Sequence, residues 1–203
     1  MKEINYVKHE VADPSALGLF GLAIVTLVAS ANKFGIVSGV SLVVPWAVFL
    51  GAFVQLIACL NDIKHGNVFG TTAFGGYAFF WFGMAMSWMI QLGVFGEGMK
   101  AAADPKAFAF VFLGYLIFTI YMTIGAIETN KTLLIIFIFI DLLFLGLTLS
   151  SLGIAYHATH LLAAIAELSI ALFSFYGSAA NVLNKTFGRE FLPLGKPLGI
   201  LKK

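Results

Sequence analysis

The sequence predicts an all-α membrane protein with six transmembrane helices in one bundle per protomer. Of its 203 residues, 60% are hydrophobic and only 11% are charged, whereas soluble domains contain about 25% charged residues. The apolar runs are long and do not alternate, which disfavours the alternating strands of about ten residues that build membrane barrels. Six of these runs have the length of about 20 residues that a helix needs to cross the bilayer.

The predicted spans follow one another with short polar breaks. We expect them at about 15–32, 40–61, 70–94, 107–128, 132–155 and 158–182. The break at 129–131 is so short that the fourth and fifth spans should be antiparallel neighbours. We predict an N-terminal tail at 1–13, a transmembrane domain at 14–183 and a C-terminal tail at 184–203.

Basic residues near the span ends predict the orientation in the membrane. One side would carry nine of them: Lys2, Lys8, Lys64, Lys131, Lys185, Arg189, Lys196, Lys202 and Lys203. The other side would carry Lys33, Lys100 and Lys106. We therefore expect a multi-pass protein of the inner (cytoplasmic) membrane with both termini in the cytoplasm. The net charge of +2 is too small to indicate a nucleic-acid partner.

Residues that could carry catalysis or hold a metal are few. The single cysteine, Cys59, forms no intrachain disulfide and no metal cluster on its own. His157 and His160 are a weak metal signal without a third ligand. The sequence contains no phosphate-binding glycine loop with lysine and no nucleophile elbow. We expect neither an enzyme nor a bound cofactor or metal.

Two predicted helix starts have residues suited to an anion. Asp13 and Pro14 open the first span, where Asp is a good cap and Pro is tolerated. Asn67 precedes the third span in the same way. Backbone N–H groups at helix N-termini attract anions. On the predicted topology both N-termini lie on one side, where Lys64 and His65 would add positive charge.

Polar side chains within the spans are the other candidates. Asp141 lies in the fifth span and Glu167 in the sixth, where a carboxylate must be paired or protonated. Each is either a hydrogen-bonded packing residue or a group for proton coupling or substrate binding. Gln55 in the second span could join helices or bind a substrate.

The stretch 66–81, GNVFGTTAFGGYAFFW, sets glycines and hydroxyls among aromatic residues at the start of the third span. Glycines permit close helix contact in membranes, and buried hydroxyls need hydrogen-bond partners. A helix that only faced lipid would not need these residues. The stretch therefore predicts a tightly packed helix or one that lines a substrate path.

This stretch resembles the signature of the acetate uptake transporter family, also called the succinate–acetate permease family. The resemblance is carried by Gln55, Lys64, Gly66, Asn67, Phe69, Gly70, Thr72, Ala73, Phe74, Tyr77 and Trp81. The segment DPSALGL is similar to the family's first signature, Asn-Pro-Ala-Pro-Leu-Gly-Leu. It is identical at Pro14, Leu17, Gly18 and Leu19, and Asp13 stands at the position of the leading Asn. Tyr176 and the stretch 181–189 resemble the last helix and tail.

The resemblance implies six helices, a ring-shaped homo-hexamer and a separate path in each protomer. It implies transport of acetate and of succinate or other short carboxylates. The family's apolar constriction would fall on Leu22, Tyr77 and Ile140, with Leu22 in place of a Phe and Ile140 in place of a Leu. Two further departures are Asp13 in place of the leading Asn, and Glu167 where glycines are usual in the sixth span.

We therefore predict a permease or channel for acetate-type carboxylates, either proton-coupled or conducting the anion. Gln55, Asn67 and Thr72 would offer neutral donors, and Phe74 and Tyr77 would accommodate the methyl end. Asp141 and Glu167 are the candidates for proton coupling. The alternatives are a membrane sensor or structural protein that transports nothing, and a channel for another small solute such as ammonium.

Overall fold

A computed structural model of the chain describes residues 11–201. All regular structure within this range is helical, and six helices are long and apolar enough to cross a membrane. The predicted fold class is confirmed, and the chain is a multi-pass membrane protein. The basic residues Lys2, Lys8, Lys202 and Lys203, which entered the orientation prediction, lie outside the described residues.

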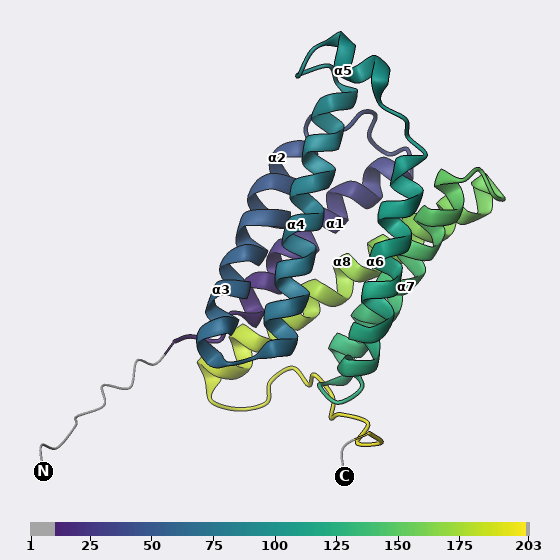
Figure 1. Cartoon of the computed structure of the whole chain (residues 1–203). Coiled ribbons are helices and arrows are strands. Elements are labelled where there is room, and N and C mark those ends of the chain that lie inside the picture. Colours follow the sequence, from purple (N-terminus) through teal and green to yellow (C-terminus); the bar gives the residue numbers. More distant parts are fainter. Residues whose placement is uncertain (1–10, 202–203) are drawn as a thin grey trace, which may run out of the picture.

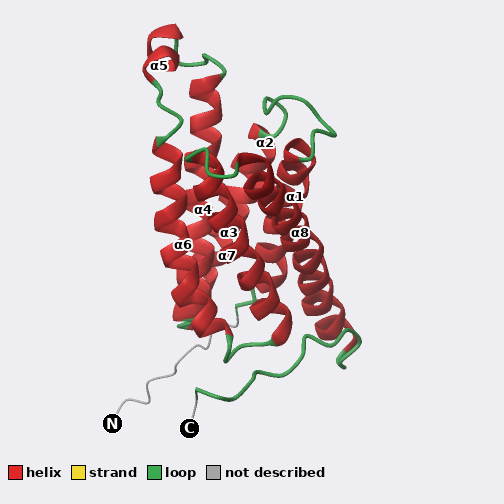
Figure 2. Ribbon diagram, turned by 90° about the vertical axis from the view of Figure 1, so that its right-hand side faces the viewer, coloured by secondary structure: helices red, strands yellow, loops and turns green. Residues whose placement is uncertain are grey.

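The helices run alternately up and down the bundle (Figure 1). Their bounds are α1 Ser15–Lys33, α2 Val44–Trp46, η1 Ala47–Val54, α3 Gln55–His65, α4 Val68–Gln91, α5 Glu97–Ala102, α6 Ala107–Ala126, α7 Lys131–Ser151 and α8 Tyr156–Phe187. The short helix α5 lies outside the bundle at one end, and the two ends of the described chain lie at the other end (Figures 1 and 2).

Local sequence explains where three spans begin or end. The second span begins at Val44 rather than near 40, with Pro45 in its first turn, where a missing N–H has no cost. The third span is α4, which follows the capping residue Asn67. The last span continues to Phe187 rather than 182 and ends at Gly188, whose φ of 64° few other residues adopt.

The last boundary bears on the predicted tail. Because α8 runs to Phe187, the segment predicted as tail from 184 begins inside this helix. Lys185 therefore belongs to the last turn of α8, where the negative end of the helix dipole stabilises a basic side chain. The division into tails and transmembrane domain stays a prediction.

Small residues let neighbouring helices approach closely. Helix α1 packs along α8, which packs on α7, and α7 packs on α6. A Cβ added at Gly21 of α1 would lie 2.5 Å from the carbonyl oxygen of Leu50 in η1. A Cβ added at Gly146 of α7 would lie 2.7 Å from the carbonyl oxygen of Thr159 in α8. Both contacts fit the use of small residues at helix interfaces in membranes.

The second span, Val44–His65, contains a π-helix in its first half. The wider turns of η1 occupy Ala47–Val54, and Gln55 follows directly after them. Gly51 within η1 packs against the Trp81 ring of α4. Because π-helical turns do not follow the α-helical spacing of side chains, they set the direction of Gln55 locally.

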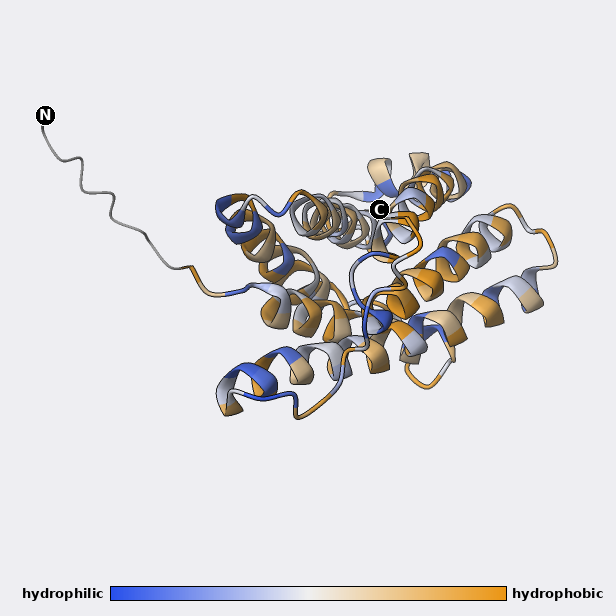
Figure 3. Cartoon of the chain, turned by 90° about the horizontal axis from the view of Figure 1, so that it is seen from below, coloured by the Kyte–Doolittle hydropathy of each residue, from blue (hydrophilic) through white to orange (hydrophobic). Residues whose placement is uncertain are grey.

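The segment after α8, residues 189–201, is called the C-terminal strap below. It leaves the end of α8 and crosses the lower end of the bundle (Figure 3). Asn184 of α8 accepts hydrogen bonds at its Oδ1 from the backbone N–H groups of Phe191 and Leu192, at 2.7 and 2.8 Å. Its Nδ2 donates to the carbonyl oxygen of Leu192. These bonds fold the strap back beneath the bundle.

The strap is also tied to the turn between α6 and α7. The backbone N–H and the hydroxyl of Thr132 both donate to the carbonyl oxygen of Leu194, at 3.0 Å each. The Glu128 carboxylate accepts from the N–H groups of Ile200 and Leu201, at 2.9 and 2.8 Å. This turn joins antiparallel neighbours, as its short length predicts.

Candidate functional site

Two cavities lie within the bundle, one toward each end. The tail-side cavity, at the end where the strap lies, has a volume of about 210 Å³. The α5-side cavity, at the opposite end, has a volume of about 380 Å³. Helices α1, α4 and α7 contribute residues to both. Each cavity includes exposed residues at its rim, such as Asp13 and Gln91, so each reaches the surface.

Most of the residues that the sequence singles out line the tail-side cavity. These residues are Asp13, Leu19, Leu22, Gln55, Asn67, Phe74, Tyr77 and Ile140. They come from four spans and are brought together only by the packing of the bundle. The cavity thus combines the predicted substrate residues with the predicted constriction, and their functional roles stay predictions.

The three constriction residues form an apolar layer between the two cavities. Leu22, Tyr77 and Ile140 are 6%, 5% and 4% exposed and line the tail-side cavity. Three residues further along their helices, Phe80 and Leu143 line the α5-side cavity. Three residues of helix rise about 4.5 Å. On α4 and α7, therefore, less than one helical turn separates the two cavities.

The Tyr77 ring is held by its hydroxyl group as well as by packing. The Thr119 hydroxyl donates to the Tyr115 carbonyl oxygen at 2.7 Å. Because a hydroxyl has one hydrogen, the 2.9 Å bond between Tyr77 and Thr119 is donated by Tyr77. Phe144 stacks on the Tyr77 ring with a centroid distance of 6.5 Å. The Tyr77 hydroxyl is therefore satisfied by α6, and the ring presents apolar surface.

Three helix N-termini meet at the tail-side cavity, whereas the sequence predicts two. Asp13 accepts from the N–H of Ser15 at 2.8 Å at the start of α1, and Asn67 accepts from the N–H of Gly70 at 3.1 Å at the start of α4. The third is α7, where Asn130 accepts from the N–H of Leu133 at 2.9 Å. Sequence reasoning missed Asn130, although an Asn just before an apolar run is a cap signal.

Asp62 is the second residue of this cavity that sequence reasoning missed. It lies on α3, is 2% exposed, and accepts a hydrogen bond from Nδ2 of Asn67 at 2.9 Å. Its Oδ2 has no hydrogen-bond partner among the described residues. Gly70 leaves room for this contact, since an added Cβ would clash with Asp62. The Asn67 amide thus joins α3 to α4, and one of its two N–H groups is not free for a substrate.

Gln55 is oriented differently from the donor role that the sequence predicts. Its Nε2 donates to the carbonyl oxygen of Gly51 at 2.8 Å, and the side chain is fully buried. Its Oε1 has no partner among residues 11–201. Gln55 therefore offers the cavity an acceptor as well as an amide N–H.

Charges in the tail-side cavity nearly balance. Each helix N-terminus acts as about half a positive charge, so three N-termini oppose the two carboxylates of Asp13 and Asp62. Within the described part of the chain, the cavity lining includes no Lys, Arg or His. Lys64 is exposed away from the cavity. A wider surface pocket, called the outer mouth below, shares Asp13, Asp62 and Asn67 with this cavity. His65 lines the outer mouth and lies within hydrogen-bond distance of the Ala12 carbonyl oxygen, at 3.2 Å.

Some predicted residues lie elsewhere. Thr72 is exposed and lines neither cavity, because five residues of helix place it about 140° around α4 from Tyr77. Leu17 is exposed on α1, and Pro14 lies at the outer mouth. Gly18 packs under the Phe74 ring, where a Cβ would clash. Within one protomer, Pro14 and Gly18 therefore position the first turn of α1, whereas Leu17 and Thr72 face outward.

The two intramembrane acids differ in their surroundings. Glu167 of α8 is 2% exposed and accepts from Nζ of Lys33 at 2.8 Å, and both residues line the α5-side cavity with His160. Asp141 of α7 lines neither cavity and accepts a hydrogen bond from the Thr123 hydroxyl of α6 at 2.7 Å. Each acid therefore has a partner on another helix, and the choice between a packing role and proton coupling stays open for both.

The fold and its two cavities define a six-span helical membrane protein with a candidate path through each bundle. The chain belongs to the GPR1/FUN34/yaaH family, whose sequence model matches residues 2–192. The family resemblance inferred from the sequence is thus confirmed.

Relatives with the same length agree with this assignment. The chain is 29% identical over 189 residues to the succinate-acetate/proton symporter SatP of Escherichia coli, covering 92% of this chain and 97% of SatP. An uncharacterized protein of Methanothermobacter thermautotrophicus is 30% identical over 200 residues, covering 95% and 96%. The solved structure of the bacterial acetate channel SatP superposes with a TM-score of 0.84 at 26% identity, covering 92% of this chain and all of that one.

The Asn67 amide can be tested by exchanging it for a carboxylate. In Asn67→Asp the cap on Gly70 remains, but the donor to Asp62 is lost and a second carboxylate is placed against the buried carboxylate of Asp62. We expect a loss of about 1–3 kcal/mol in stability at pH 8. The loss should shrink as the pH falls, because protonation of one carboxyl removes the repulsion. Thermal unfolding of the purified protein in detergent measures both effects.

Asn130→Asp is the matched control for this substitution. Asn130 caps α7 in the same way, but no carboxylate accepts from its amide among the described residues. Since Asn and Asp are nearly equal as caps, this variant should unfold close to the wild type. Equal losses in both variants would contradict a specific bond between Asn67 and Asp62.

Proposed function

We propose that this chain carries acetate and other short carboxylates, including succinate, across the membrane through a path in each protomer. One observation carries the proposal: two cavities reach opposite ends of one bundle and are separated by a thin apolar layer at Leu22, Tyr77 and Ile140. The similarity to SatP, described as a succinate-acetate/proton symporter and as an acetate channel, supports the substrate class.

The apolar layer makes a bare anion costly to pass. A carboxylate that loses its water in an apolar environment without compensating bonds is strongly disfavoured. Phe74, Tyr77 and Ile140 offer a suitable surface to a methyl group, and Asn130 and the helix N-termini offer N–H donors at the cavity. We infer that the carboxyl end is held at the tail-side cavity while the apolar layer limits passage.

Two unpartnered acceptors favour the proton-coupled form of this transport. Oε1 of Gln55 and Oδ2 of Asp62 are buried and lack partners among the described residues. An acceptor suits the O–H of a carboxylic acid, whereas it repels the oxygens of a carboxylate. We propose that acetate crosses together with one proton, as a neutral pair.

A second candidate substrate is ammonium. Asp13 and Asp62 give the tail-side cavity two carboxylates, and no basic side chain lines it within residues 11–201. Such a lining suits a small cation or its neutral base. The three convergent helix N-termini and the acetate names of the relatives favour the carboxylate, so ammonium ranks second.

For the orientation, we propose that the tail-side cavity opens to the cytoplasm of a cell with this protein in its inner membrane. The support is the bias of basic residues: Lys64, Lys131, Lys185, Arg189 and Lys196 all lie at the tail-side end of the described helices or in the strap. Fewer basic residues lie at the α5 end, which fits the positive-inside rule.

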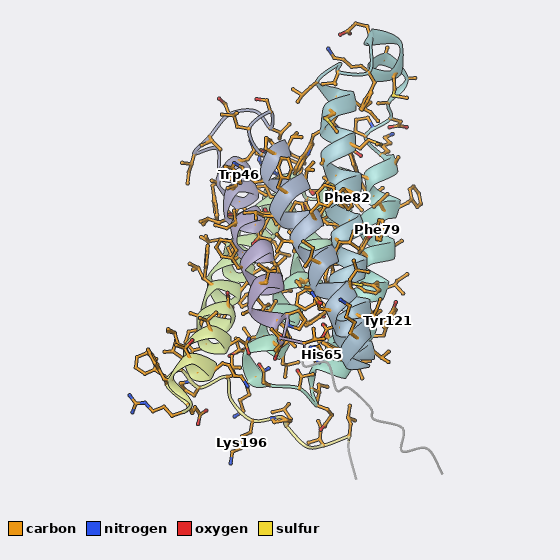
Figure 4. All side chains as sticks on the ribbon, turned by 90° about the vertical axis from the view of Figure 1, so that its left-hand side faces the viewer. Trp46, His65, Phe79, Phe82, Tyr121 and Lys196 are labelled. Atoms are coloured by element: carbon orange, nitrogen blue, oxygen red, sulfur yellow. The ribbon has the colours of Figure 1, made fainter. Side chains whose placement is uncertain are left out.

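For the assembly, we propose a homo-hexameric ring, as the family resemblance implies. An outward face of η1 and α4 is built of aromatic side chains that touch one another: Phe49 with Phe53, Phe53 with Phe82, and Phe79 with Phe82 (Figure 4). Phe79 is 63% exposed in the single chain. Native mass spectrometry of the purified protein should give six chains, and a monomer would contradict the ring.

Transport is tested with the purified protein in liposomes. Labelled acetate should accumulate faster than in protein-free liposomes, and the lumen should acidify by about one proton for each acetate that enters. Flux of one acetate with one proton is electrically silent. A current that reverses at the acetate equilibrium potential would instead indicate an anion channel.

The same liposomes distinguish the rival functions. Acetate uptake no faster than in protein-free liposomes, with acetate or a protein partner still bound, would favour a sensor or structural role. Lumenal alkalinisation on addition of ammonium, again above the protein-free rate, would favour the ammonium channel. Both results would count against carboxylate transport.

The constriction is tested by removing its ring. Tyr77→Ala should raise acetate flux about tenfold if the ring contributes about 1.4 kcal/mol to the barrier. It should also admit larger carboxylates such as benzoate. The effect is measured as the initial rate of acetate uptake into liposomes that contain equal amounts of wild type or variant. Both proteins should first elute at the same volume from a size-exclusion column.

Tyr121→Ala is the matched control, because Tyr121 of α6 is exposed and lines neither cavity (Figure 4). It should leave flux and selectivity at the wild-type level. Unchanged transport in Tyr77→Ala would show that the limiting constriction lies elsewhere.

A further inference from the structure

The ion pair between Lys33 and Glu167 lies within the α5-side cavity. Lys33 is the last residue of α1, where the helix dipole favours a cation. Its Nζ donates to Oε2 of Glu167 at 2.8 Å. The two residues are 134 positions apart in the sequence, and the packing of α1 on α8 brings them together.

The two partners differ in their access to the cavity. The Lys33 side chain is 16% exposed, and the Glu167 side chain is 2% exposed. A lysine ammonium has three hydrogens, and within the described chain one of them is used, by Glu167. Lys33 can therefore meet a solute in the cavity, whereas Glu167 is reached only after the pair opens.

Lys33 is the only charged partner of Glu167 among the residues that line this cavity in the described chain. The titratable residues of the lining are Lys33 from α1 and Tyr156, His160 and Glu167 from α8. The residues that α4, α6 and α7 contribute are uncharged, and they include the polar residues Gln91 of α4 and Ser150 and Ser151 of α7. No second cation in the described lining compensates Glu167 if Lys33 turns away, apart from His160 when it is protonated.

We infer that Lys33 is the carboxylate-binding group of the α5-side cavity, and that a substrate carboxylate which binds it displaces Glu167 and leaves Glu167 to take up a proton. This inference rests on the proposed function, because it assumes that a short carboxylate enters the cavity. The substrate and Glu167 present the same chemical group to Lys33, so they compete for it directly. A buried carboxylate without a cation is strongly disfavoured, and protonation removes its charge.

The exchange conserves atoms and charge. One carboxylate enters from solution, the Lys33–Glu167 ion pair is replaced by a Lys33–substrate pair, and one proton from the bulk solution forms the carboxylic acid of Glu167. The site gains one negative charge and one proton, so its net charge does not change. Coupling between acetate and a proton then follows from a single shared cation.

The experiment measures protons and acetate on the same purified full-length protein. Trp81 and Trp88 line the α5-side cavity, so quenching of tryptophan fluorescence on titration with sodium acetate reports binding there. A pH indicator in weakly buffered detergent solution reports proton uptake. The wild type should take up about one proton per bound acetate, and its Kd should rise about tenfold per pH unit over the coupled range.

Three variants separate proton uptake from acetate binding. Glu167→Gln should still bind acetate but take up no proton, and its Kd should change less than about twofold per pH unit. Lys33→Gln should weaken acetate binding at least tenfold. Glu97→Gln, which removes the acid of the exposed Lys100–Glu97 pair at 3.3 Å, is the matched control and should behave as the wild type.

Several outcomes would overturn the inference. These are wild-type acetate binding without proton uptake, full proton uptake in Glu167→Gln, or loss of proton uptake in Asp141→Asn instead. In each of them labelled acetate could still enter liposomes, so the proposed transport of short carboxylates would stand, whereas its coupling to a proton is tested separately by the acidification of the lumen. Absence of both acetate flux and acetate binding would reject the proposed function and this inference together. If Glu167→Gln fails to fold, acetate binding without proton uptake in the wild type still overturns the inference, and so does acetate binding at wild-type affinity in Lys33→Gln.

Discussion

The separation of the two cavities depends on the anchored Tyr77 ring. Its hydroxyl must donate to Thr119, because the Thr119 hydrogen is already given to Tyr115. The ring is thus fixed between α4 and α6 while Phe144 of α7 packs on its face. Without this anchor, the apolar layer of less than one helical turn would not keep two water-accessible spaces apart. Leu22 and Ile140 complete the layer, but each is a flexible aliphatic side chain held by packing alone.

Much of the fold follows from the sequence, because span length and hydropathy are local properties. The six spans, the tight turn before α7 and the cap at Asn67 belong to this group. The family signature also identified residues that converge in one cavity. The partners of the buried acids did not follow from the sequence, since Lys33 with Glu167 and Asn67 with Asp62 depend on how helices pack and on the geometry of one turn. Membership of the family signature does not place a residue on the cavity side of its helix: Thr72 lies about 140° around α4 from Tyr77 and is exposed in the single chain.

The two cavities have different electrostatic designs. The tail-side cavity opposes backbone N–H groups with carboxylates, and its buried acceptors Gln55 and Asp62 lack partners in the described chain. The α5-side cavity instead holds a lysine that is neutralised by one glutamate. A solute that moves from the α5-side cavity to the tail-side cavity would therefore leave the Lys33 ammonium, which can return to Glu167. It would then meet the fixed backbone dipoles of three helix N-termini. In the proposed transport, such an arrangement would bind an anion on one side without holding it permanently on the other.

The C-terminal strap has a consequence for the order in which the protein is made. Leu194 forms part of the tail-side cavity wall and is held by Thr132, and Glu128 binds the chain further along. The strap follows α8 in the chain, so a ribosome synthesises it after all six spans. The six helices can thus insert first, and the mouth of the cavity receives its last wall only when synthesis has passed residue 194. A fusion partner attached close behind residue 201 would pull on the turn between α6 and α7, and an N-terminal tag avoids that strain.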